Sequence, residues 1–139
     1  MHPILRNILA LVAGLLIGMS VNMLLIMVSG FIIPPPEGTD LSTPEGLKAA
    51  MPLFETKHFI MPFLAHALGT LVGAIVVVKL AVSQHFIFAL IIGCFFLYGG
   101  IMMITMVPSP VWFNVVDLGL AYIPMAIIGW KIGEKQSQS

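Results

Sequence analysis

Asp117 is the only carboxylate inside the four long apolar runs that make up most of this 139-residue chain. A charged group within lipid costs about 2.5 to 3.5 kcal/mol on insertion scales, so its side chain is expected to turn toward a polar partner. His66 offers that partner. Counted inward from the outer end of each run at about 1.5 Å per residue, Asp117 and His66 both lie roughly 9 to 10 Å deep. The sequence therefore predicts that the two side chains contact each other.

Further polar side chains lie slightly deeper, roughly 13 to 17 Å from the outer end by the same count; they are Asn22, Thr70, Tyr98 and Tyr122. Together with Asp117 and His66 they predict a ligand-binding pocket in the outer half of the membrane. Asp117 would be the charged contact and His66 its proton-sensitive partner. Pro124 adds to the prediction, because it removes the amide that would pair with the carbonyl of Leu120 and so loosens the fourth helix beside Asp117.

Two interpretations of Asp117 stay open at this point. It is either a structural acid held by His66 or Asn114, or part of a site for a small ligand, an ion or a lipid group. The second interpretation gives a small membrane protein that binds or transports its ligand. Transport would need motion at Pro124 or a pore between subunits, because the inner half of the runs is almost purely apolar. The competing hypothesis is a non-catalytic accessory or scaffold subunit of a larger membrane complex.

Methionines form a second stripe along the first run, and more of them lie near the outer end of the third; they are Met19, Met23, Met27, Met102, Met103 and Met106. Thioethers beside an imidazole suit Cu(I). Methionine also fills irregular gaps between helices, and we favour that role. We expect no metal site and no cofactor. We also expect His58, at the outer interface, to be solvated.

The chain lacks the patterns of common active sites. It has no His-x-x-x-His pair, no phosphate-binding glycine loop and no nucleophile elbow, and Cys94 is its only cysteine. Nothing in the sequence therefore favours an enzyme, and we name no catalytic residue.

The elements that must position these residues are membrane-spanning helices. The chain is 59% hydrophobic and 9% charged with a formal net charge of zero, whereas soluble domains carry about 25% charged residues. The neutral balance also argues against a nucleic-acid partner. The apolar runs cover 8–33, 59–78, 86–107 and 111–130, each long enough to cross roughly 30 Å of hydrocarbon. Backbone groups in lipid must pair internally, so we predict a single all-α membrane domain, an antiparallel bundle of four transmembrane helices.

Basic residues set the expected orientation. Four of them flank the runs on the side of both termini, against two in the first loop; they are Arg6, Lys79, Lys131 and Lys135, against Lys48 and Lys57. Basic residues concentrate on the cytoplasmic side, so we expect both termini in the cytoplasm. Trp112 and Trp130 fall at opposite ends of the fourth run, as interfacial aromatic residues do. Residues 131–139 would form a cytoplasmic tail, disordered after Gly133.

The outer loop, residues 34–58, is the only sizeable segment between the runs. Its prolines at 34–36 favour an extended, stiff exit from the first run. The Ser-Thr-Pro-Glu motif at 42–45 is typical of a capping box with proline in the first helical turn. Apolar residues follow at helical spacing until Pro52. We expect a short amphipathic helix on the outer leaflet, acting as a lid over the helix ends or as a gate or docking surface.

Small residues recur every four positions on the first and second runs, where they include Gly14, Gly18, Gly69 and Gly73. Residues of this size and spacing let helix backbones approach closely. The partner helix could belong to the same chain or to another copy. We therefore expect either a homo-oligomer or a membrane partner protein, besides the lipid bilayer itself.

The Pro-Pro-Pro-Glu-Gly stretch at 34–38, the His-Ala-Leu-Gly stretch at 66–69 and Asp117 give the chain a resemblance to a known group. Nearly the whole sequence resembles a set of small bacterial four-span membrane proteins that carry no assigned activity. The resemblance implies an inner-membrane protein and supplies no catalytic residue. The size and span count are also similar to those of small multidrug transporters, but that family places a glutamate in its first helix.

Overall fold

The computed structural model describes residues 2–137, and within them every regular element is helical. The elements are α1 (Pro3–Ile32), α2 (Pro44–Ala50), the 3₁₀ turns η1 (Met51–Leu53) and η2 (Thr56–Phe59), α3 (Ile60–Leu80), α4 (His85–Met106), α5 (Val111–Leu120) and α6 (Ile123–Ser137). Four stretches are long and apolar enough to cross a membrane: Pro3–Ile32, Thr56–Leu80, His85–Met106 and Val111–Lys135. The predicted all-α bundle of four spans is confirmed, and the protein is a multi-pass membrane protein.

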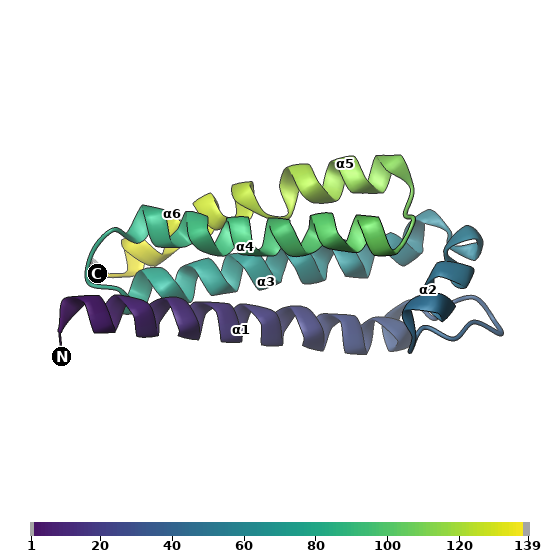
Figure 1. Cartoon of the computed structure of the whole chain (residues 1–139), viewed down its shortest axis with the longest axis horizontal. Helices are drawn as coiled ribbons and strands as arrows, with labels where there is room; N and C mark the ends of the chain where they lie inside the picture. The colour runs from purple at the N-terminus through teal and green to yellow at the C-terminus, as the bar shows by residue number, and fades with distance from the viewer. Residues whose placement is uncertain (1, 138–139) are drawn as a thin grey trace.

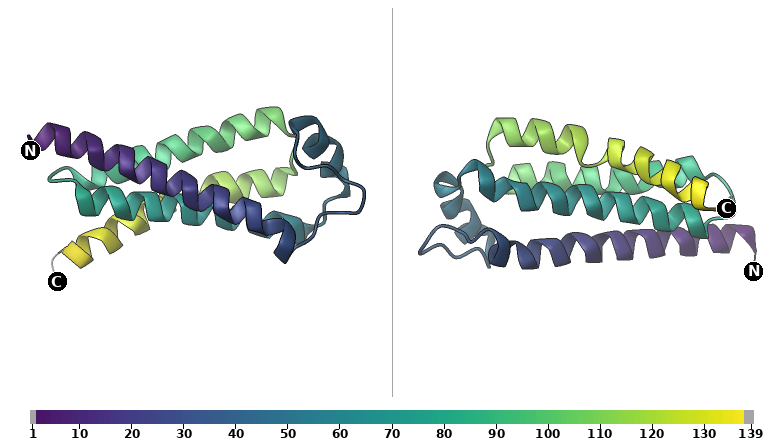
Figure 2. Two further views of the ribbon diagram at one scale, coloured as in Figure 1. Left: turned by 90° about the horizontal axis from the view of Figure 1, so that it is seen from below. Right: turned by 180° about the vertical axis from the view of Figure 1, so that it is seen from behind.

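The spans run antiparallel to their neighbours in the chain, and both described ends of the chain lie at the same end of the bundle (Figure 1). α3 occupies the centre and packs against α1, α4 and α6. α1 packs on α3 and crosses it obliquely, as the view from below shows (Figure 2). The outer loop with α2, η1 and η2 closes the opposite end of the bundle. We call this the loop end, and the other the terminal end.

The small-residue faces of α1 and α3 meet within the chain. A Cβ added to Gly14 would lie 2.8 Å from the carbonyl oxygen of Gly73, and one added to Gly18 would lie 2.7 Å from that of Gly69. The reciprocal distances, from Gly69 to the carbonyl of Gly18 and from Gly73 to that of Gly14, are both 2.9 Å. The two backbones therefore touch directly, and this glycine stripe is filled by α3 rather than left for a second copy.

Side chains of α1 also fasten its first turns to the α3–α4 connection at the terminal end. Arg6 Nε donates to the carbonyl of Leu80 at 3.0 Å. The Asn7 amide donates to Ser83 Oγ at 3.1 Å and accepts from the backbone N–H of Val82 at 2.9 Å. α1 accordingly begins at Pro3, ahead of the predicted apolar run, and its polar first turn holds two spans together.

The outer loop contains the expected short helix, with its start shifted by one residue. Thr43 caps α2 by accepting from the N–H of Gly46 at 3.0 Å, and Pro44 takes the first turn. Ser42, the cap that the motif predicts, instead donates its hydroxyl and N–H to Asp40 Oδ1. These bonds hold the pKa of the exposed Asp40 carboxyl below its ordinary value. Pro52 does not end the run, which continues through η1 as a 3₁₀ turn.

The fourth span is not the continuous helix that the sequence predicts for 111–130. α5 ends at Leu120, and α6 starts at Ile123 after a turn at Ala121 and Tyr122. The break lies just before Pro124, whose missing N–H leaves the helix one bond short there. α6 then runs to Ser137, so the prediction of disorder after Gly133 is wrong for 134–137, and 138–139 lie outside the described residues.

Glycines on α6 explain how its helix continues along α3. Cβ atoms added to Gly129 and Gly133 would lie 2.7 Å from side-chain atoms of Ala74 and Val78, both in the half of α3 at the terminal end. Trp112 and Trp130 lie at opposite ends of the span, as expected, with Trp112 against Phe59 and Trp130 against Phe86.

Candidate functional site

Asp117 is placed by α5 and is buried, with 4% of its surface exposed. Phe113, one turn earlier, is the other buried residue of α5, so this face of the helix points into the bundle. Asp117 Oδ1 lies 2.8 Å from His66 Nδ1 on α3. Asp117 Oδ2 accepts a hydrogen bond of 2.9 Å from the hydroxyl of Tyr122, in the turn that breaks the fourth span. The predicted contact between Asp117 and His66 is confirmed.

The three side chains form one network, which we call the Asp117 network: Asp117, His66 and Tyr122. When Asp117 is ionised it only accepts hydrogen bonds, and the His66 Nδ1 in contact with it then carries the proton. In the neutral ring Nε2 is then an unprotonated acceptor. Among the described residues Nε2 has no hydrogen-bond partner, and 21% of the His66 side chain is exposed. The Tyr122 ring stacks on the His66 ring with centroids 5.7 Å apart, which fixes the orientation of the imidazole.

Gly100 on α4 makes room for this network. A Cβ added there would lie 2.5 Å from the Tyr122 hydroxyl oxygen and 2.8 Å from the ring carbon that carries it. Tyr122 is 1% exposed and is the largest of the fully buried side chains. The glycine therefore lets α4 close over the phenol while its hydroxyl remains aimed at Asp117.

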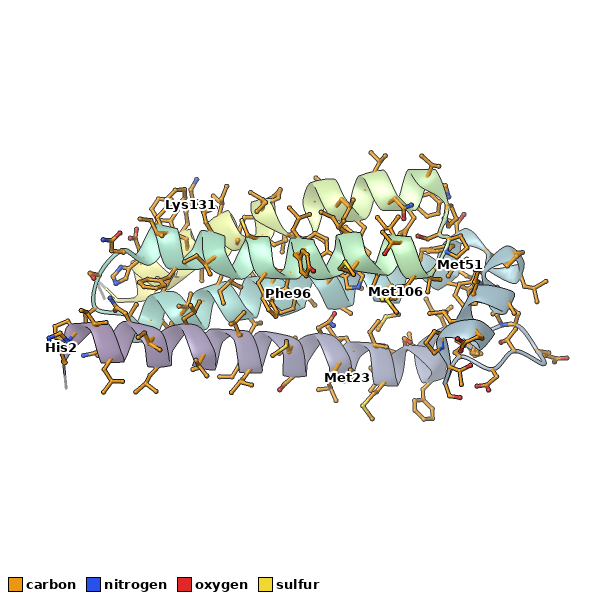
Figure 3. The ribbon with its side chains drawn as sticks, viewed as in Figure 1. His2, Met23, Met51, Phe96, Met106 and Lys131 are labelled. Carbon is orange, nitrogen blue, oxygen red and sulfur yellow. The ribbon has the colours of Figure 1, made fainter. Side chains whose placement is uncertain are left out.

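A cavity of about 690 Å³ lies at the loop end of the bundle, beside the Asp117 network. Its walls come from α1, the outer loop, α3, α4 and α5, and most of the lining side chains are apolar. Five of them are methionines: Met23, Met27, Met51, Met61 and Met103. Figure 3 labels Met23 on α1 and Met51 on the outer loop, both in the half of the bundle that holds the cavity. Asn22, His66 and Asp117 supply polar groups to the same wall surface.

The cavity ends toward the middle of the bundle, where α1 and α3 come into backbone contact. Gly18 lies one helical turn from Asn22 on the terminal side, and a Cβ there would lie 3.1 Å from two ring carbons of Phe96. Phe96 itself is 8% exposed, and Figure 3 shows it near the middle of the bundle. Beyond it Gly14 lies against Gly73, Val77 and Ile92. The lining of the cavity therefore ends at Asn22, His66 and Gly100, on the loop-end side of Phe96.

The structure separates the six residues predicted to bind ligand into two groups. Asn22, His66 and Asp117 line the cavity, and Tyr122 reaches it through Asp117. Thr70 does not take part, because it is 0% exposed and donates its hydroxyl to the carbonyl of His66 in its own helix. Tyr98 is also apart: 64% of it is exposed, and it lines a shallow apolar groove on the outer face of α4. The prediction rested on depth along the helix, and depth does not say which face of the helix a residue occupies.

Asn22 is the least satisfied polar side chain of the cavity. Its Oδ1 is buried and has no hydrogen-bond partner in the described residues. A Cβ added to Gly69 would lie only 2.9 Å from the Cβ of Asn22, because α1 and α3 approach each other closely here. This close approach holds the Asn22 amide at the cavity wall. A buried amide oxygen without a donor costs free energy, which a ligand that donates a hydrogen bond would recover.

The loop end contributes residues that the sequence did not single out as site residues. His58 is not solvated as expected but 8% exposed: its Nδ1 accepts from the N–H of Glu55 at 2.9 Å, and its Nε2 lies 3.2 Å from the carbonyl oxygen of Pro34. The ring therefore ties the end of the outer loop to its beginning. The capping signal at 55–58 could have revealed this, because the side chain three residues after a helix cap often bonds back to it.

Asn114 also lines the cavity, but it does not hold Asp117. Its amide oxygen accepts from the hydroxyl of Ser109, and its amide nitrogen donates to the Ser109 carbonyl at 3.3 Å. These bonds anchor the first turn of α5 to the connection before it. His66 and Tyr122 are thus the partners of the buried carboxylate.

Within residues 2–137 no group of three or more His, Cys, Asp or Glu side chains is placed to hold a metal ion. A scan against protein-family models and searches of curated proteins and of solved structures find no match to this chain. The geometry of the site is therefore the ground on which its function must be argued.

Proposed function

We propose that this protein binds a small amphipathic molecule from the outer leaflet of a bacterial inner membrane, with both termini in the cytoplasm. The observation that carries the proposal is the cavity of about 690 Å³, apolar on most of its wall, with an unpaired imidazole nitrogen and an unpaired buried amide at its polar side. Small-molecule sites combine a mostly apolar cavity of this size with a few oriented polar groups.

Burial of Asp117 supports a binding role for the network. An acid with a purely structural role would need hydrogen-bond partners inside the helix bundle and no partner that faces a cavity. Here the carboxylate fixes His66 from one side while the other ring nitrogen is left without a partner, next to the cavity. A histidine whose one nitrogen is held by a carboxylate presents its second nitrogen in a defined protonation state. This arrangement orients a hydrogen-bonding group toward a ligand.

The methionine content of the wall supports a flexible apolar ligand. Methionine side chains are unbranched and polarizable, so they adapt to irregular or variable shapes. The outer loop adds Leu47 and Met51 to the wall and so covers the cavity. These features favour an acyl or similar chain over a rigid, fully polar solute.

The glycine stripe supports a scaffold or homo-oligomer role less strongly than its spacing suggests. Gly14 and Gly18 pack on α3 of the same chain, so they offer no free face to a partner. The end of the cavity lining on the loop-end side of Phe96 likewise favours binding over transport through the chain. We therefore place binding before transport and before assembly.

The proposal is tested by filling the cavity. Met103 lines it from α4, whereas the adjacent Met102 does not. In Met103→Trp the indole should occupy the space of the ligand, and the purified protein should lose most of its co-purifying amphiphile in native mass spectrometry from mild detergent. Met102→Trp is the matched control and should keep it. Equal lipid loads on both variants and on the unmodified chain would refute a ligand in this cavity.

A further inference from the structure

The charges and hydrogen-bonding groups around the cavity restrict the polar end of its ligand. Among the described residues that line the cavity there is no lysine or arginine, and the one acidic side chain is that of Asp117. The other titratable lining groups are His66, held by Asp117, and His58, held by the outer loop. An anionic head group would therefore meet a carboxylate and no opposing cation in a medium of low dielectric constant.

The hydrogen-bonding groups of the wall also restrict the polar end of the ligand. With Nδ1 protonated against Asp117, neutral His66 offers an acceptor at Nε2. The buried oxygen of Asn22 is a second acceptor without a donor, and the Asn22 amide nitrogen likewise makes no hydrogen bond within the described residues. The hydroxyls nearby are already used: Ser109 donates to Asn114, and Thr39 donates to the carbonyl of Pro36 at 2.7 Å. The wall therefore has an unpaired acceptor at His66 and an unpaired amide at Asn22, which a polar end that donates hydrogen bonds can satisfy.

We propose that the ligand is an amphiphile whose polar end donates hydrogen bonds and carries no negative charge, such as a lipid alcohol or a long-chain amine. The polar end lies against His66 and Asn22, and the apolar chain lies along the methionine-rich wall toward the outer loop. The inference rests on the proposed function and adds the chemical class of the ligand. Fatty acids and phosphate-headed lipids are excluded from the polar end of the cavity by the carboxylate.

The experiment compares three amphiphiles that share one chain, dodecanol, dodecylamine and dodecanoate. Each is added separately to the full chain in nanodiscs of a zwitterionic lipid, at a pH where the acid is ionised. Bound adducts are counted by native mass spectrometry, with Met103→Trp as the blank for binding outside the cavity. Dodecanol and dodecylamine should bind, and dodecanoate should bind about tenfold or more weakly.

The outcomes separate the two proposals. If none of the three exceeds the blank, the proposed function fails. If dodecanoate binds as well as dodecanol, the cavity binds amphiphiles, but the assignment of the polar end is overturned. Both results are measured on the unmodified chain, so neither depends on whether a variant of the Asp117 network folds.

A substitution sharpens the test. In Asp117→Asn the side-chain amide can donate to His66 Nδ1, which moves the ring proton to Nε2 and turns the cavity acceptor into a donor. The negative charge disappears at the same time. The ratio of dodecanoate to dodecylamine binding should rise by about tenfold or more. Tyr98→Phe, on the exposed face of α4, is the control and should leave the ratio unchanged. An unchanged ratio in a folded Asp117→Asn variant would contradict the inference.

Discussion

Adding one methyl group to Gly18 should separate α1 from α3 and destabilise the bundle. The new Cβ would lie 2.7 Å from the carbonyl oxygen of Gly69 and 3.1 Å from two ring carbons of Phe96. Carbon atoms in contact prefer about 3.5 to 4.0 Å. The oxygen belongs to a helix backbone and cannot move aside alone, so the whole of α1 must shift by several tenths of an ångström.

The size of the effect follows from a matched substitution. Gly18→Ala and Gly99→Ala both replace a helical glycine by alanine, and each gains about 1 kcal/mol of helix propensity. A Cβ on Gly99 meets nothing within 4 Å. The difference between the two variants therefore isolates the steric term, which overpacking of a tight interface sets at about 1 to 3 kcal/mol. Gly18→Ala should be less stable than Gly99→Ala by that amount.

The assay is unfolding of the purified full chain in mixed micelles by titration with sodium dodecyl sulfate, followed by tryptophan fluorescence. Native mass spectrometry of the same samples reports the subunit number. Equal free energies of unfolding for the two variants would refute the packing of Gly18 against Gly69. A loss of subunits without a loss of stability would instead place the glycine stripe between copies of the chain.

Three further predictions concern hydrogen bonds. Tyr122→Phe removes the donor to Asp117 and should lower the free energy of unfolding by about 0.6 to 3 kcal/mol, the range from average membrane hydrogen bonds to bonds with charged groups; an unchanged value in the same titration would contradict the bond. Asn7→Ala should speed hydrogen exchange of the backbone amide of Val82, because that N–H loses its acceptor. An unchanged exchange rate at Val82 would speak against the contact. Ser42→Ala should raise the pKa of Asp40 toward 3.8 in a nuclear magnetic resonance titration. Because the fold lowers this pKa, the stabilisation is present above the ordinary value and is lost as pH falls through the folded one; an unchanged pKa would show that the Ser42 hydroxyl does not lower it, since alanine keeps the backbone N–H bond to Asp40.

The parts of the fold that follow from hydropathy were predictable because every backbone N–H and C=O in lipid must pair within the protein. Each apolar run had to form a helix, and the structure has four such spans. The outer helix was predictable for a different reason, its Ser-Thr-Pro-Glu signal, although Thr43 rather than Ser42 became the cap. Thr43 accepts from the N–H three residues on, whereas Ser42 donates to Asp40. Two neighbouring hydroxyl residues compete for one role, and sequence alone does not rank them.

The candidate site was predictable only in part, because depth and orientation are separate properties of a helical residue. The pairing of Asp117 with His66 followed from the high cost of an isolated charge in lipid. A tyrosine or threonine incurs a much smaller cost at the same depth, so its position does not force it inward. Tyr98 accordingly faces outward, and Thr70 satisfies its hydroxyl within its own helix.

The break in the fourth span explains why the cavity and the acid occur together at the loop end. α6 packs closely on α3 through Gly129 and Gly133, so the terminal half of the bundle is filled by backbone contacts. α5 makes far fewer contacts with α3 and lies on the side of α4 away from α1 (Figure 1). The loop end is therefore left with a cavity between α1, α3, α4 and α5, which the outer loop covers. Asp117 reaches into that space from α5 and is held by bonds from α3 and from the turn itself. A straight fourth helix packed on α3 as closely as α6 would fill the space of the cavity, so the turn before Pro124 is the feature on which the proposed binding site depends.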